Sequence, residues 1–226
     1  MTSFWIFASV MLLPSGSIVA ERTASNGTQT SPVPNGTRPG APDELQVTAE
    51  DVEAAFLDAS IVPDIIPKPP PELLKAAYET ANISLGNVIA PSRTIIAPTV
   101  ACIADAKKFH TFMILDIDPP SRASSVLRSY IIALYVNIPG SLVSKAYSVA
   151  PYIPTTPVPG SGPHRYVFLF YEQYNEIFVK DEELLSLGVY RWRFSIYKFA
   201  AKYRLTELVA GNYFISEIPK NFADYC

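Results

Sequence analysis

Two short stretches of this sequence place acid–base side chains two residues apart. Asp116 and Asp118 lie at the C-terminal end of one strongly apolar stretch, and His164 and Tyr166 lie at the start of another. Alternate residues of an extended strand point to the same side. If the two strands run antiparallel, a carboxylate pair, an imidazole and a phenol therefore meet at one edge of a sheet. A few convergent polar groups on an apolar wall are typical of a small-ligand pocket.

An aspartate beside a histidine has a definite chemical use. The carboxylate fixes the imidazole tautomer and raises its pKa, so that the ring can become a cationic donor to an anionic ligand. Arg122 and Arg165 could serve the same anion, but we favour the interpretation that they brace the two loops through hydrogen bonds to carboxylates or carbonyls. Asp116 could instead bond turn amides at its strand end. His110 has no acid spaced to meet it and is interpreted as a core or edge histidine.

The same side chains could in principle perform acid–base catalysis. The sequence, however, contains no G-x-S-x-G, H-E-x-x-H, phosphate-loop or clustered metal-ligand motif. Its two histidines and two cysteines are far apart, so a structural zinc site is not expected. We therefore predict a binding protein and not an enzyme, with no cofactor and no metal.

Three apolar stretches are predicted to form the core strands that position these groups. Residues 109–117, 130–138 and 166–171 are rich in β-branched and aromatic residues and end in turn residues. They are apolar at both odd and even positions, which indicates strands covered on both faces, as in the interior of a sandwich. Apolar residues at helical spacing predict an amphipathic helix over 194–205. Gly211 is predicted to end that helical segment before a further strand.

The remaining elements are predicted to be short. Thr48 and Asp51 have capping-box spacing before Val52 and Phe56, which predicts a short helix. A Pro-rich extended segment and short strand-like runs then lead to the core strands. The 21 prolines against 10 glycines favour fixed turns and extended segments. The predicted fold is mostly β with a few peripheral helices.

Charge argues against a nucleic-acid partner, and hydropathy argues against a transmembrane segment. The net charge is −3 and there is no basic run, so nucleic acid is not an expected partner. No stretch beyond the N-terminal region is long and apolar enough to be transmembrane.

The N-terminal region has the pattern of a secreted protein. Residues 1–20 carry no charge and combine an apolar stretch with a helix breaker and small residues, which predicts a signal peptide. Residues 21–44 contain almost nothing that could be buried and are predicted to be a disordered, glycosylated arm. Residues 45–226 form the predicted domain. The expected location is extracellular, or a lumen of the secretory pathway such as the vacuole.

Sequons and cysteines agree with that location. Asn26, Asn35 and Asn82 each begin an N-x-S/T sequon and are candidate glycosylation sites. In an oxidising compartment Cys102 and Cys226 could pair as a disulfide. Two unpaired or intermolecular thiols are the alternative, and the sequence leaves both open.

Four stretches in order resemble one known family. LDIDPPSR at 115–122 resembles the D-P-D-A-P-S-R motif of phosphatidylethanolamine-binding proteins, also called the Raf kinase inhibitor protein family, and GPHRYVFLFYEQ at 162–173 resembles their G-x-H-R-Y-V-x-L-x-Y-x-Q motif. The 48 residues from Asp116 to His164 match the spacing of the family. GNVIAP at 86–91 and KFAAKYRLTELVAGNYF at 198–214 resemble two further family segments, so that the resemblance covers the chain from about Val52 onward.

The resemblance implies a fold and two candidate functions. It implies two antiparallel sheets packed as a sandwich, with a small pocket for an anion or phospholipid headgroup at one edge. Carried over by position, the pocket residues are Asp116, Asp118, Pro119, Ser121, Arg122, Thr156, Pro157, His164 and Tyr166. The Pro-rich stretch before His164 resembles the fungal-type branch that includes the carboxypeptidase Y inhibitor. Inhibition of a serine carboxypeptidase or another protease through a protein–protein surface is therefore the alternative function.

One pocket position departs from the family pattern. The family usually has a second pocket histidine sixteen residues after the first motif aspartate, and this sequence has Ile132 there. The fourth motif position has also changed, from Ala to Pro119. A missing charged hydrogen bond is worth roughly 1.5–3 kcal/mol, about ten- to a hundredfold in affinity. The pocket is therefore either weakened or adapted to a less charged or more apolar ligand.

Overall fold

The computed structural model describes residues 47–221. Several predictions fall outside the described residues: the signal peptide 1–20, the arm 21–44, the sequons at Asn26 and Asn35, and Cys226.

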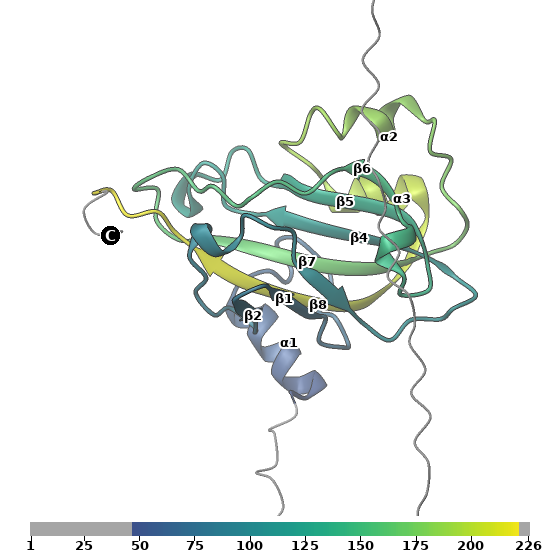
Figure 1. The fold of residues 1–226 in the computed structure, drawn as a ribbon, viewed down its shortest axis with the longest axis horizontal. Coiled ribbons are helices and arrows are strands. Elements are labelled where there is room, and N and C mark those ends of the chain that lie inside the picture. Colours follow the sequence, from purple (N-terminus) through teal and green to yellow (C-terminus); the bar gives the residue numbers. More distant parts are fainter. Residues whose placement is uncertain (1–46, 222–226) are drawn as a thin grey trace, which may run out of the picture. The chain divides into compact units, whose positions relative to one another are not determined.

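The strands of the described residues form two antiparallel sheets (Figure 1). The larger has the strand order β6-β5-β4-β7-β8, with β4 (Phe109–Asp116), β5 (Tyr130–Pro139), β6 (Tyr147–Ala150), β7 (His164–Gln173) and β8 (Leu205–Ser216). The smaller has the order β2-β1-β3, with β1 (Lys75–Tyr78), β2 (Ala81–Ile83) and β3 (Thr99–Ala101). The mostly β prediction with two antiparallel sheets is confirmed.

Helices are few and short. They are α1 (Ala49–Asp58), α2 (Glu182–Ser186) and α3 (Ile196–Tyr203), with single 3₁₀ turns η1 (Pro91–Arg93), η2 (Arg122–Ser124) and η3 (Val143–Lys145). The capping box predicted for the first helix is present, because the Thr48 side chain accepts from the Asp51 amide and the Asp51 carboxylate accepts from the Thr48 amide. No helix in the described part of the chain is long and apolar enough to cross a membrane.

The larger sheet is apolar on both faces, as the three core stretches predict. Even-numbered side chains of β4, such as Phe112 and Ile114, pack in a cluster with the smaller sheet. Odd-numbered ones, such as Met113 and Leu115, pack in a second cluster with α1, α2, α3 and the segment after α1. Burial of both faces explains why these strands read as continuous apolar runs.

Two predicted boundaries near the C-terminus were wrong. The helix predicted over 194–205 is shorter, because Ser195 caps α3 and Arg204 takes the left-handed conformation (φ 54°) that ends it. Gly211 does not end a helical segment but lies inside β8. A Cβ at this position would lie 2.8 Å from Pro70 Cγ, so the glycine allows a close approach of the Pro-rich segment to the strand.

Candidate ligand-binding cavity

Strand register brings the predicted polar groups to one edge of the larger sheet. β4 runs antiparallel to both of its neighbours, and Asp116, its last residue, lies opposite Tyr130 on β5 and Tyr166 on β7. His164 is the first residue of β7 and lies two positions before Tyr166. The end of one apolar strand and the start of another therefore meet, which is the antiparallel arrangement that the sequence suggested.

A cavity of about 240 Å³ opens at this edge. It is lined by Asp116, Pro119, Pro120, Leu127, Tyr130, Ile132, Ile153, Pro154, Thr156, Pro157, Val158, His164, Tyr166 and Trp192. Seven of the ten residues predicted for the pocket are among them. The volume is slightly below the range of roughly 300–1,000 Å³ that is usual for drug-sized ligands, so the cavity suits a smaller molecule.

His164 is held at both ring nitrogens. Its Nδ1 lies 2.8 Å from Asp116 Oδ2 and its Nε2 lies 3.0 Å from Ser161 Oγ. Ser161 Oγ in turn donates to the Val158 carbonyl at 2.6 Å, so it can only accept from the ring. All three bonds are made together when both ring nitrogens carry protons, and His164 is then a cation paired with Asp116.

Electrostatics favours the same protonation state of His164. Burial alone lowers the pKa of a histidine, but the hydrogen bond and negative charge of Asp116 outweigh that effect and raise the pKa of His164. The Asp116 carboxylate is itself occupied, because its second oxygen accepts from the Asp118 amide at 2.9 Å. The two charged groups of the cavity therefore neutralise each other.

Tyr166 contributes a buried polar atom to the cavity lining. The side chain is fully buried, and its hydroxyl makes no hydrogen bond of normal length and angle among the described residues, although the Asp116 carboxylate lies close to it. Burial raises the pKa of Tyr166 well above its usual range, and the charge of Asp116 and a weak hydrogen bond to its carboxylate raise it further, so the phenol keeps its proton. Buried hydroxyls are rarely left unpaired, because an unmade hydrogen bond costs about 1–3 kcal/mol.

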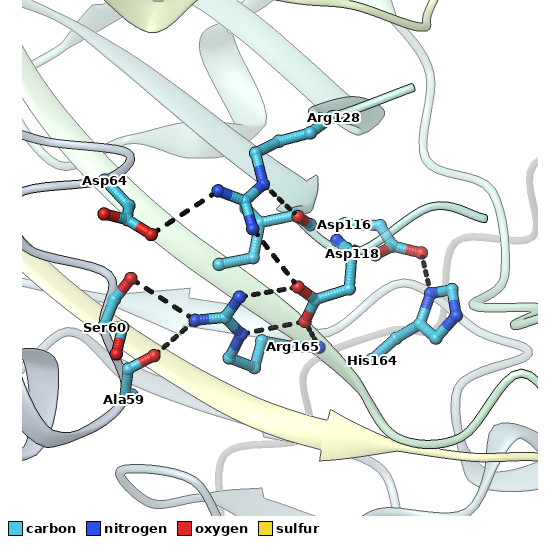
Figure 2. Close-up of polar contacts among 9 residues, drawn as sticks. Ala59, Ser60, Asp64, Asp116, Asp118, Arg128, His164 and Arg165 are labelled. Carbon is cyan, nitrogen blue, oxygen red and sulfur yellow. Dashed lines mark hydrogen bonds and ion pairs between the residues drawn. The ribbon is translucent and has the colours of Figure 1, made fainter. Parts of the chain in front are cut away.

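Asp118 does not line the cavity, in contrast to the expected carboxylate pair. Figure 2 shows its carboxylate in contact with Arg165 and Arg128. β4 ends at Asp116, so the alternation of side chains does not continue to Asp118. Its carboxylate is fully buried and is bound by Arg165 through Nε to Oδ2 at 2.8 Å and Nη2 to Oδ1 at 2.6 Å. Burial would raise the pKa of Asp118, but these bonds outweigh it and hold the pKa below its usual value.

The bracing role interpreted for Arg165 agrees with its contacts. The same guanidinium donates to the carbonyls of Ala59 and Ser60 after α1, so it ties the end of that helix to the loop after β4 (Figure 2). Arg122, the first residue of η2, is exposed, and Ser121 just before it is half-buried; neither lines the cavity.

Three other predicted features lie away from the cavity. His110 is buried and stacked on Phe170, with ring centroids 5.2 Å apart, which fits a core histidine. Asn82 is exposed on β2. Cys102 is half-buried, and burial raises the pKa of its thiol to about 11. Its pairing with Cys226 stays a prediction.

Sequence reasoning missed one wall of the cavity. Trp192 comes from a loop far along the chain and stacks on Tyr130, with ring centroids 6.1 Å apart. The neighbouring Arg191 donates to the carbonyls of Ile132 at 3.2 Å and Pro151 at 3.0 Å, which holds that loop in place. No local pattern signals such a contact.

The Pro-rich loop before His164 forms another wall of the cavity, and hydrogen bonds to a neighbouring segment hold it in place. The Tyr152 hydroxyl donates to the Thr94 carbonyl at 2.5 Å, and Thr155 and Thr94 share a buried hydroxyl contact at 2.8 Å. These bonds tie the loop before His164 to the segment after η1. Thr156 and Pro157, both predicted pocket residues, are thereby placed on the cavity wall.

Comparison with known proteins identifies the family. A family model described as phosphatidylethanolamine-binding protein matches residues 79–214, more than half of the chain. The chain belongs to the phosphatidylethanolamine-binding protein family, as its motifs predicted.

Three individual proteins that are similar to this chain share 31%, 28% and 21% sequence identity with it. The chain is 31% identical over 169 residues to the putative odorant-binding protein A5 of Drosophila melanogaster, across 74% of this chain and 80% of that protein. It is 28% identical over 171 residues to a 26 kDa secreted antigen of Toxocara canis, across 72% of this chain and 63% of that protein. The crystal structure of carboxypeptidase Y inhibitor complexed with its cognate proteinase has a TM-score of 0.65 at 21% identity, across 78% of this chain and 99% of that chain. At that identity the likeness concerns the fold.

Proposed function

We propose that this chain is a secreted, non-enzymatic binding protein that takes a small molecule into the cavity at the edge of the larger sheet. The observation that carries the proposal is Tyr166, which lines the cavity and whose buried hydroxyl lacks a hydrogen bond of normal geometry. A bound molecule with one oxygen or nitrogen at that point would satisfy it. The neutralised His164–Asp116 pair beside it adds polarity, and the rest of the lining is mostly apolar.

Several facts support a binding role over catalysis. The relatives named above are a putative binding protein, an antigen and an inhibitor. His164 is engaged at both nitrogens, so it has no free lone pair with which to act as a general base. The predicted signal peptide at 1–20 and the resemblance to a secreted antigen support secretion.

A titration followed at His164 tests the proposal. The family description names phosphatidylethanolamine, so inorganic phosphate and a short-chain phosphatidylethanolamine are the first probes. Saturable shifts of the His164 ring signals in an NMR titration are expected for a probe that enters the cavity. Thr156→Trp, at an exposed position of the cavity wall, should block these shifts, whereas Ser141→Trp on an exposed turn should not. Shifts that persist in Thr156→Trp would place binding elsewhere.

Protease inhibition is the second candidate. It rests on the likeness of fold to the carboxypeptidase Y inhibitor and on the Pro-rich stretch before His164. Inhibition of a serine carboxypeptidase or another protease by a larger surface predicts potency that survives Thr156→Trp. Absence of inhibition against a panel of serine carboxypeptidases and secreted proteases would remove this candidate.

A further inference from the structure

The charge balance of the cavity bears on the kind of ligand it can take. Asp116 and His164 are the acidic and basic residues of the lining, and no lysine or arginine is among the described residues that line it. Because the two are paired at 2.8 Å, the cavity has no net charge to offer an anion. A phosphate dianion would enter beside the Asp116 carboxylate with no unpaired cation to offset the repulsion.

Ser161 removes the remaining charged donor. Nε2 is the ring nitrogen of His164 that Asp116 leaves for another acceptor such as an anionic oxygen, and Ser161 Oγ already accepts from it at 3.0 Å. The serine oxygen is fixed there by its own bond to the Val158 carbonyl. Gly160 and Gly162 on either side have positive φ (75° and 84°), a conformation that glycine adopts without strain and that shapes the loop carrying Ser161.

What remains for a ligand is a set of neutral polar groups on mostly apolar walls, of which the Tyr166 hydroxyl is the fully buried one. Among the buried polar side-chain atoms of the lining, the Tyr166 hydroxyl is the one that lacks a hydrogen bond of normal geometry. Most of the other lining residues are apolar, and two of them, Val158 and Trp192, are 54% and 52% exposed. This arrangement fits a molecule with one hydrogen-bonding group at its inner end and an apolar body.

We propose that the cavity selects an uncharged, alcohol- or carbonyl-bearing apolar molecule over a phosphate ester, with Tyr166 as its hydrogen-bond partner and Ser161 as the residue that withdraws His164 from anion recognition. The inference rests on the proposed function and narrows its ligand. Ile132 fits the same selection, because it places an aliphatic side chain in the lining where the family resemblance places a second imidazole.

The test uses two probes that share one chain, hexan-1-ol and hexyl phosphate. Calorimetric titration of the full chain should give an affinity for hexan-1-ol at least about tenfold above that for hexyl phosphate. Tyr166→Phe should weaken hexan-1-ol binding by about two- to tenfold, the effect of one neutral hydrogen bond. Tyr171→Phe is the matched control, because Tyr171 is also buried on β7 but packs in the cluster on the opposite face. It should leave the affinity unchanged.

Ser161→Ala tests the second part of the inference. Freeing the outer nitrogen of His164 should raise the affinity for hexyl phosphate about tenfold, the effect of one charged hydrogen bond, and leave hexan-1-ol within about twofold. Ser141→Ala, on an exposed turn, should change neither. Tighter binding of hexyl phosphate by the unmodified chain, or no gain in Ser161→Ala, would overturn the selection while leaving the cavity a binding site. If neither probe binds, the proposed function itself fails, and the inference with it.

Discussion

Removal of the guanidinium of Arg165 should destabilise the fold more than most single substitutions do. Arg165→Met keeps an unbranched apolar stem like that of arginine but leaves the Asp118 carboxylate fully buried, with the backbone amide of residue 165 as its close donor at 2.9 Å. The next cation, Arg128, lies 3.8 Å away. The substitution also leaves the carbonyls of Ala59 and Ser60 without their donor.

The expected magnitude follows from these contacts. Breaking a buried ion pair by removing one partner costs about 3–5 kcal/mol, a large part of the roughly 5–15 kcal/mol that a typical domain has. Asp118→Asn combined with Arg165→Met removes the buried charge as well. The double variant should therefore lose less than the sum of the two single losses, by about 1–3 kcal/mol.

Urea unfolding followed by tryptophan fluorescence measures the effect. Arg204→Met is the control, because Arg204 is exposed and stacks on Tyr174 at 4.6 Å from the ring centroid. It should cost less than about 1 kcal/mol. A loss below about 1 kcal/mol for Arg165→Met, or additive losses in the double variant, would refute the view that this buried pair holds the loop after β4 to the end of α1.

Three further predictions concern the cavity and its support. Because the folded-state pKa of His164 lies above its usual 6.5, its ion pair with Asp116 stabilises the fold fully below about pH 6.5 and loses that effect as the pH rises through the folded-state pKa. The unfolding free energy, measured from about pH 5.5 upward, should therefore fall above about pH 6.5 in the unmodified chain and should not do so in Asp116→Asn. Ile132→His should raise the affinity for hexyl phosphate about ten- to a hundredfold by calorimetry, and an unchanged affinity would show that this position does not face the ligand. Gly211→Ala should lower the urea midpoint by an amount equivalent to about 1–3 kcal/mol, because its Cβ would lie 2.8 Å from Pro70 Cγ, and an unchanged midpoint would mean that the Pro-rich segment adjusts freely.

The core of the fold could be predicted because its sequence signals are local. Strands with both faces buried carry apolar residues at both odd and even positions, and the segments around Phe112 and Phe168 show that pattern directly. The antiparallel meeting of Asp116 with Tyr166 followed from the polar residues at the ends of these runs. The end of α3 could not be predicted, because it depends on the backbone conformation of Arg204.

The cavity could be predicted only in part, for reasons of geometry. Asp118 was assigned to the pocket by extending strand alternation past the end of β4, where it no longer applies. Trp192 reaches the lining through a loop remote in sequence, and only the tertiary fold places it against Tyr130. Ser161 was within reach of sequence reasoning, since it lies three residues before His164 in a Gly-rich turn, but its bond to the ring depends on the conformation of that turn.

The measurement that tests the central claim most directly is an isoleucine-methyl NMR titration of the full chain with hexan-1-ol and hexyl phosphate. Ile132 and Ile153 line the cavity, whereas Ile61 and Ile66 belong to the cluster on the opposite face of the sheet. We expect saturable shifts at Ile132 and Ile153 at lower concentrations of the alcohol than of the phosphate, with Ile61 and Ile66 unmoved. Shifts at Ile61 or Ile66 without shifts at Ile132, or no saturable shift with either probe, would contradict the assignment of this cavity as the binding site.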